Sequence, residues 1–195
     1  MIDESKIVVT DNFLPQEQFE RLQEYIMSNR MAWYTCGRNQ PGNYPLMQHI
    51  FWSDTKGPEQ YPDVPMLHLG YNYIRPITNR IPIAAMIRCR ANLSWYTSTQ
   101  ERREYHTDTI FDCTTAVFYV HDSDGCTVFD NPGDEELEVE TVANRLVEFP
   151  SSYEHSSTPF TTTDRRIVIN FNYIKQPPLP ANKPTINPLS NPEHW

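Results

Sequence analysis

The stretch CTTAVFYVHDSDGCTVFD, residues 113–130, decides the fold class. Two runs rich in β-branched and aromatic residues, 113–120 and 126–130, lie on either side of the polar tetrapeptide DSDG at 122–125. Such runs are typical of strands, and an Asp-Gly pair between two of them is typical of a tight hairpin turn. The stretch therefore predicts two consecutive strands joined by a hairpin at DSDG.

Similar β-rich runs continue on both sides of this stretch. They lie at 86–96, 104–108, 137–142, 144–150, 155–159 and 165–174, which makes eight strands in all, and DNPGDEE at 130–136 predicts a second turn. Ahead of them, residues 6–13 predict a short strand and residues 14–29 an amphipathic helix, with Phe19, Leu22 and Ile26 at helical spacing. We expect a mainly β fold with an N-terminal helix and a jelly-roll core.

The remaining segments set the domain organisation. We expect one domain over residues 1–175, with its core at 85–174, followed by a proline-rich tail at 176–195 that is an extended strap or a flexible end. Residues 33–80 show no sustained periodicity and predict loops with short elements. The aromatic residues of this segment either cover a substrate or fill a satellite core: Trp33, Tyr34, Tyr44, Phe51, Trp52 and Tyr61.

The composition disfavours several partners. A formal net charge of −9 disfavours nucleic acid, which requires clustered Lys and Arg. The N-terminus lacks the basic region and long apolar core of a secretory signal, and no later apolar run approaches membrane-spanning length. We therefore expect a cytoplasmic protein without a membrane partner. The oligomeric state stays open.

The heptapeptide EYHTDTI, residues 104–110, contains the first candidate metal ligands. In a strand, His106 and Asp108 project from the same face. With six histidines and 25 acidic residues in 195, such a pair arises about once by chance, so it requires a third ligand. His155, at the start of the last predicted hairpin, is that candidate, although a surface histidine is the alternative. Two imidazoles and one carboxylate leave three octahedral positions open, as in non-haem Fe(II) oxygenases.

Two adjacent arginines at the start of the last strand are candidate carboxylate ligands. An inward guanidinium binds a carboxylate through two hydrogen bonds, which Lys does less well. Alternation favours Arg166 over Arg165, because Val168, Asn170 and Asn172 then line a cavity while Ile167, Ile169 and Phe171 pack outward against the helix. Arg165 would then lie exposed beside Asp164.

Together these residues carry a family resemblance. Residues 85–174 resemble the Fe(II)- and 2-oxoglutarate-dependent oxygenases, in their prolyl-hydroxylase-like branch. The matching features are His106-Thr-Asp108, His155 within HSSTP, an arginine about ten residues later, and Tyr96 ten residues before the first histidine. The leading VVTDNFLPQEQFERLQEYI resembles the first strand and helix of that branch.

The resemblance implies a double-stranded β-helix in which His106, Asp108 and His155 bind Fe(II). The cosubstrate 2-oxoglutarate would chelate the metal and meet the arginine with its far carboxylate. Tyr96 would donate to the cosubstrate, and Thr127 and Asn170 are further candidates for its pocket. Phe118 stands where some relatives carry a second cosubstrate-binding tyrosine, so Thr127 or Tyr119 would supply that contact.

The implied activity is that of a dioxygenase, a hydroxylase that consumes O2 and is supported by ascorbate. A carboxylate at Asp108 favours hydroxylation over halogenation. Two rivals remain: a non-catalytic jelly-roll binding or structural protein, and a cupin-like enzyme that keeps the metal without the cosubstrate. The substrate stays open between a peptidyl proline, another protein side chain and a small molecule.

Overall fold

A computed structural model of the chain describes residues 2–35, 46–53, 70–96, 98, 102 and 104–177. Tyr44, Tyr61 and residues 178–195 of the predicted tail lie outside these ranges. Among the described residues, no helix is long and apolar enough to cross a membrane.

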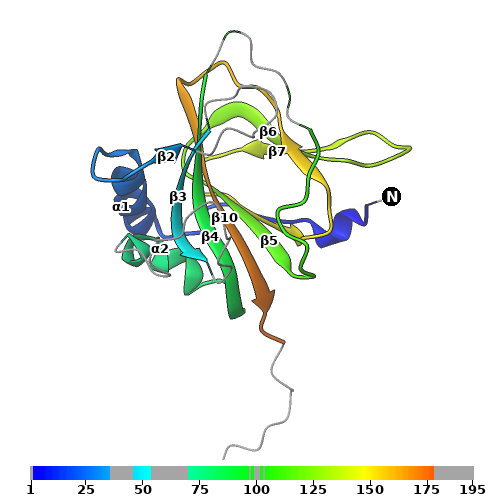
Figure 1. The fold of residues 1–195 in the computed structure, drawn as a ribbon, viewed down its shortest axis with the longest axis horizontal. Coiled ribbons are helices and arrows are strands. Elements are labelled where there is room, and N and C mark those ends of the chain that lie inside the picture. Colours follow the sequence, from blue (N-terminus) through cyan, green and yellow to red (C-terminus); the bar gives the residue numbers. More distant parts are fainter. Residues whose placement is uncertain are drawn as a thin grey trace, which may run out of the picture.

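Two antiparallel sheets form the structure, as predicted for a mainly β jelly-roll fold (Figure 1). The larger sheet has the strand order β1-β8-β5-β10-β4-β3-β2. Its strands are β1 (Val8–Thr10), β2 (Tyr34–Thr35), β3 (Leu46–Ser53), β4 (Ile83–Trp95), β5 (Thr114–Tyr119), β8 (Leu146–Pro150) and β10 (Arg165–Lys175). The smaller sheet, in the order β7-β6-β9, consists of β6 (Ser123–Phe129), β7 (Leu137–Thr141) and β9 (His155–Ser157).

Helices cover the outer face of the larger sheet. The helices on this face are α1 (Gln16–Met27) and α2 (Tyr71–Thr78), which lie side by side in Figure 1. A short 3-10 helix, η1 (Glu4–Lys6), precedes β1 and contacts β8. Phe19, Leu22 and Ile26 of α1 are buried in the main core, as their spacing predicts. Ile167, Ile169 and Phe171 of β10 belong to the same cluster. The outer face of β10 is therefore the apolar one.

A second apolar cluster lies on the other side of the larger sheet. It joins Val117, Tyr119 and Val168 of the larger sheet to Phe129 and Val139 of the smaller one. Because this cluster fills only part of the space between the sheets, polar side chains of the inner faces surround it, and these build the site described below.

The predicted hairpin at DSDG is wrong. Ser123, Asp124 and Gly125 belong to β6, and β5 lies in the other sheet, so the chain crosses between sheets at 121–122. The physical reason is tertiary: the Asp124 carboxylate accepts from the backbone N–H of Thr161 at 2.8 Å. A side chain at Gly125 would place its Cβ 3.0 Å from that of Phe160, so glycine serves close packing there.

Two other sequence predictions differ from the structure. Residues 104–108 form no strand, only an isolated bridge between His106 and His155. Within 33–80, β3 is a full strand paired with β4. Phe51 is buried in the main core and Trp33 packs against it, so both have a packing role, although in the main core and not in a satellite core, while Tyr34 is exposed. The second turn is confirmed, since Phe129 and Leu137 pair across residues 130–136.

Candidate metal centre

The three candidate ligands meet because of a short backbone bridge. The N–H of His106 donates to the carbonyl of His155 at 3.0 Å, and the N–H of His155 donates to the carbonyl of His106 at 3.0 Å. His155 begins β9, whose pairing with β6 fixes its position. The bridge therefore ties the segment after β4 to the smaller sheet and brings the two imidazole rings to 5.0 Å between centroids.

One ligand atom from each of His106, Asp108 and His155 lies within 4.8 Å of the others. Asp108 Oδ2 faces His155 Nε2 at 3.8 Å and accepts from Asn170 Nδ2 at 3.3 Å. The other oxygen, Oδ1, accepts from Arg90 Nη2 at 3.1 Å and lies 3.3 Å from Arg88 Nη2. One carboxylate oxygen is thus held by arginines while the other points toward the imidazoles.

Both imidazoles have the tautomer that metal binding requires. Nδ1 of His155 lies 3.1 Å from the carbonyl oxygen of Tyr153, and Nδ1 of His106 lies 3.2 Å from that of Glu104. A carbonyl oxygen only accepts, so each Nδ1 carries a proton, and Nε2 is the ring nitrogen left to bind a metal. Burial lowers the pKa of His155 against the opposing charge of Asp108, which favours the neutral ring.

Asp108 is an ionised carboxylate despite its burial. Its side chain is 1% exposed. Burial by itself would raise the pKa of Asp108, but electrostatic interactions, with Arg90 first and then with His155, Arg88 and His106, lower it to about 2. A carboxylate oxygen beside two imidazole nitrogens is a donor set that suits Fe(II), so the residues present fit the metal.

A cavity extends from the histidines between the two sheets. The cavity is lined by Asn92, Ser94, His106, Val117, Thr127, His155, Ser156, Ser157, Arg166, Val168 and Asn170. Two of its buried acceptors, Oδ1 of Asn92 and Oδ1 of Asn170, have no hydrogen-bond partner among the described residues. Buried polar atoms of this kind are normally satisfied, so they mark a place for a polar ligand or water.

Arg166 lies inside this cavity and links the sheets. The side chain belongs to β10, and its guanidinium donates to Thr127 Oγ1 of β6 at 3.3 Å and to Thr141 Oγ1 of β7 at 3.0 Å. The guanidinium carbon also lies 5.7 Å from the ring centroid of Tyr119, whose hydroxyl donates to Thr127 at 2.8 Å. The cavity is therefore lined both by the cationic side chain of Arg166 and by the two histidines of the ligand set.

The other predicted residues divide between the cavity and its surroundings. Arg165 lies outside, 3.9 Å from Asp164 and over the ring of Trp95, as alternation predicts. Tyr96 lies beyond the end of β4, where it is 46% exposed, and it is not one of the residues that line the cavity. Phe118 packs outward against Phe13 and Phe19, so Tyr119 is the inward tyrosine.

Sequence reasoning missed the inner face of β4. Arg88, Arg90, Asn92 and Ser94 alternate with Cys89, Ala91 and Leu93 of the main core. This polar-apolar alternation in RCRANLS was available in the sequence and indicates a strand with one functional face.

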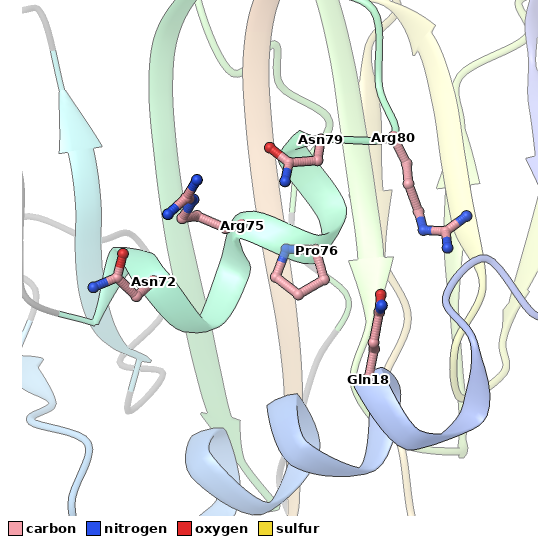
Figure 2. Close-up of a pocket in the computed structure, with 6 residues that line it drawn as sticks. All are labelled: Gln18, Asn72, Arg75, Pro76, Asn79 and Arg80. Atoms are coloured by element: carbon pink, nitrogen blue, oxygen red, sulfur yellow. The ribbon is translucent and has the colours of Figure 1, made fainter.

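A larger hollow lies elsewhere and lacks this chemistry. It has a volume of about 640 Å³ and lies between Gln18 of α1 and the end of α2, lined further by Asn72, Arg75, Pro76, Asn79 and Arg80 (Figure 2). Figure 2 shows the side chains of Arg75 and Arg80 pointing in different directions, so they do not converge on a common ligand. We therefore place the functional site between the sheets.

Comparison with known proteins identifies the fold. No family model matches the chain, and no curated protein matches its sequence significantly. Among solved structures, a prolyl hydroxylase from Trichoplax adhaerens, in complex with a peptide fragment of the hypoxia inducible factor oxygen degradation domain, superposes with a TM-score of 0.61 at 14% identity. The match covers 87% of this chain and 84% of that one.

Two further structures agree. A Pseudomonas putida prolyl-4-hydroxylase gives a TM-score of 0.60 at 14% identity, over 87% of this chain and 93% of that one. The epimerase SnoN, in complex with Fe3+, alpha-ketoglutarate and nogalamycin RO, gives 0.59 at 12% identity, over 87% and 79%. The chain therefore has the fold of the Fe(II)/2-oxoglutarate oxygenases and resembles their prolyl-hydroxylase-like branch, as its sequence predicts.

Proposed function

We propose that this protein is an Fe(II)- and 2-oxoglutarate-dependent oxygenase that hydroxylates a C–H bond of its substrate. The observation that carries the proposal is one arrangement: three metal-ligating atoms lie within 4.8 Å of one another, and the two histidines among them line the same cavity as the buried Arg166. The fold supports it, since structural neighbours include such oxygenases.

The proposed roles follow from the contacts. His106, Asp108 and His155 would hold Fe(II), with Arg88 and Arg90 fixing the orientation of the Asp108 carboxylate through its Oδ1. Arg166, Thr127 and Tyr119 would bind the far carboxylate of 2-oxoglutarate, and Asn170 would orient Asp108 Oδ2. When bound, Fe(II) with 2-oxoglutarate and O2 supplies the oxidising chemistry, which ascorbate would support.

The chain's own residues orient the reactants and exclude water. Val117 and Val168 line the cavity beside the polar groups, and the two sheets enclose it. In such an enclosed space a guanidinium discriminates strongly for a carboxylate, because the competing hydration is reduced. We propose hydroxylation in preference to halogenation because Asp108 supplies the carboxylate ligand.

The substrate is a separate question. One structural neighbour carries a peptide and another a small molecule, so both classes are compatible with the fold. The acidic composition still disfavours nucleic acid. A cytoplasmic location remains our prediction.

A turnover assay without the substrate tests the proposal. With Fe(II), ascorbate and O2, purified protein should convert 2-oxoglutarate to succinate slowly, because uncoupled turnover requires only the metal and cosubstrate sites. His106→Ala should abolish it, and His121→Gln, which removes a histidine outside the cavity, should retain it. If bound metal and 2-oxoglutarate are demonstrated and no succinate forms above the His106→Ala level, the non-catalytic binding protein is the better description.

A further inference from the structure

The inner face of β4 continues past the metal ligands. Its pairing with β10 places Ser94 opposite Arg166, Asn92 opposite Val168, Arg90 opposite Asn170 and Arg88 opposite Asn172. Ser94 and Asn92 line the cavity that contains Arg166, whereas Arg90 and Arg88 lie level with Asp108 and beyond it. The two arginines therefore lie on the side of the metal centre away from the proposed cosubstrate carboxylate.

Arg88 is held by its neighbours through two of its three guanidinium nitrogens. Its Nε and Nη2 donate to Asn172 Oδ1 at 3.1 and 2.9 Å, and Nη2 also donates to the Asp108 carbonyl oxygen at 2.7 Å. Asn172 is fixed in turn, because its Nδ2 donates to Thr115 Oγ1 at 3.0 Å. Arg88, Asn172 and Thr115 thus form a hydrogen-bonded network beyond the metal centre.

Arg90 has donors to spare. Nη2 donates to Asp108 Oδ1 at 3.1 Å, while Nε is buried without any acceptor among the described residues. A buried donor that lacks an acceptor is destabilising, so this N–H, which has no acceptor within the described part of the chain, marks a place where a ligand acceptor would be stabilising. A carboxylate is the natural partner, since the N–H groups of a guanidinium form charge-assisted hydrogen bonds with carboxylate oxygens.

Charge and exposure point to the same partner. Within the described part of the chain, two guanidinium groups face the single carboxylate of Asp108, which leaves an excess positive charge at this place in a chain of net charge −9. The side chains of Arg88 and Arg90 are 22% and 20% exposed, whereas that of Asp108 is 1% exposed. Because Arg90 Nε is itself buried, the exposed surface belongs to the other atoms of that side chain, and a solute would approach the guanidinium from there without displacing Asp108.

We propose that Arg90, supported by Arg88, binds a carboxylate of the substrate beside the metal centre. This inference rests on the proposed function and narrows its substrate class to organic acids, either small molecules or chains whose terminal carboxylate enters the site. An internal peptidyl residue other than Asp or Glu presents only neutral groups to Arg90, and is disfavoured. Arg90 is then a specificity-determining residue in addition to a support for Asp108.

The test uses acetate as the probe and acetamide as its neutral match. The protein is loaded with Mn(II) and saturated with 2-oxoglutarate, and nuclear relaxation of the probe's methyl protons reports their approach to Mn(II). Acetate should relax several times faster than acetamide with the wild-type protein and with Arg21→Gln, an exposed arginine of α1. Arg90→Gln should reduce the relaxation rate of acetate to that of acetamide. Arg90→Lys should restore part of the difference between the two rates.

Two outcomes would overturn the inference. One is equal relaxation of acetate and acetamide by the wild-type protein. The other is an undiminished acetate effect in Arg90→Gln, which would indicate direct coordination to Mn(II). Mn(II) and 2-oxoglutarate occupancy are measured for every variant.

A second measurement covers the case in which Arg90→Gln fails to fold or to bind metal. With diamagnetic Zn(II) in wild-type protein, the arginine Nε–H signal that Arg90→Lys lacks should shift with acetate and not with acetamide. Absence of that shift would overturn the inference. Failure of this inference is distinguishable from failure of the proposed function. If only the proposed function fails, acetate still binds but no succinate forms.

Discussion

The two faces of β10 have opposite chemistry although both are buried. Ile167, Ile169 and Phe171 pack under the helices with the rest of the main core, whereas Arg166, Asn170 and Asn172 face the smaller sheet among polar partners. The outer face contributes hydrophobic stabilisation, and the inner face maintains charged and amide groups at a cost in desolvation. A shift of one residue in register would exchange the two sets, so the outer face also fixes which arginine enters the cavity.

The largest expected effect comes from breaking the outer face. Phe118 of β5 is fully buried and contacts the rings of Phe13 and Phe19 edge-on. Phe118→Ala should lower the free energy of unfolding by about 3–5 kcal/mol, because it leaves a cavity in the main core. Urea denaturation of metal-free protein measures this. Phe111→Ala, at a residue 49% exposed, should stay within about 0.5 kcal/mol, and equal effects of the two would refute the assignment.

The next effect separates the two arginines of β10. Arg166→Ala should raise the dissociation constant of 2-oxoglutarate about a hundredfold or more, because loss of one partner of a buried charge pair costs about 3–5 kcal/mol. Arg165→Ala should raise it only a fewfold, since surface pairs such as that with Asp164 contribute under about 1 kcal/mol. Calorimetric titration with Mn(II) present measures both. A larger loss in Arg165→Ala would mean that the strand has the opposite phase.

A smaller effect concerns Asp108 in the metal-free protein. The pKa of Asp108 is about 2 in the folded state, below its ordinary value of 3.8. The ionised carboxylate therefore stabilises the fold at pH values above 3.8, and this contribution is lost as the pH falls toward 2. Asp108→Asn should therefore be less stable than wild type by about 2–3 kcal/mol above pH 5. The difference should shrink between pH 4 and 2. Urea titrations across this range, with a chelator, test it, and a difference independent of pH would contradict the assigned electrostatics.

Local patterns predicted much of the fold because the strands are short and alternating. The runs at 137–142, 144–150 and 165–174 correspond to β7, β8 and β10, and the helix at 14–29 corresponds to α1. β3 was missed because a register shift between Ile50 and Trp52 interrupts its alternation. The hairpin predicted at DSDG was wrong for another reason: contacts of Asp124 and Gly125 with residues distant in sequence outweigh the local turn signal.

The candidate site was predictable where one strand carries the information. Alternation along β10 predicted that Arg166 points inward and Arg165 outward, and the structure places both so. Tyr96 was chosen by spacing alone, and its place past the end of β4 depends on where the strand stops. Tyr119 was left open beside Phe118, because the pairing of Val168 with Tyr119 that fixes its face is not visible in the sequence.

Metal binding tests the central claim most directly, namely that the inner face brings His106, Asp108 and His155 together to hold an ion. Titration of metal-free wild-type protein with Mn(II), followed by calorimetry, should show one site per chain. Asp108→Ala and His155→Ala should abolish tight binding, because each removes one of three ligands. Arg165→Ala should bind as wild type does. Stoichiometric binding that persists unchanged in both ligand variants would contradict the account.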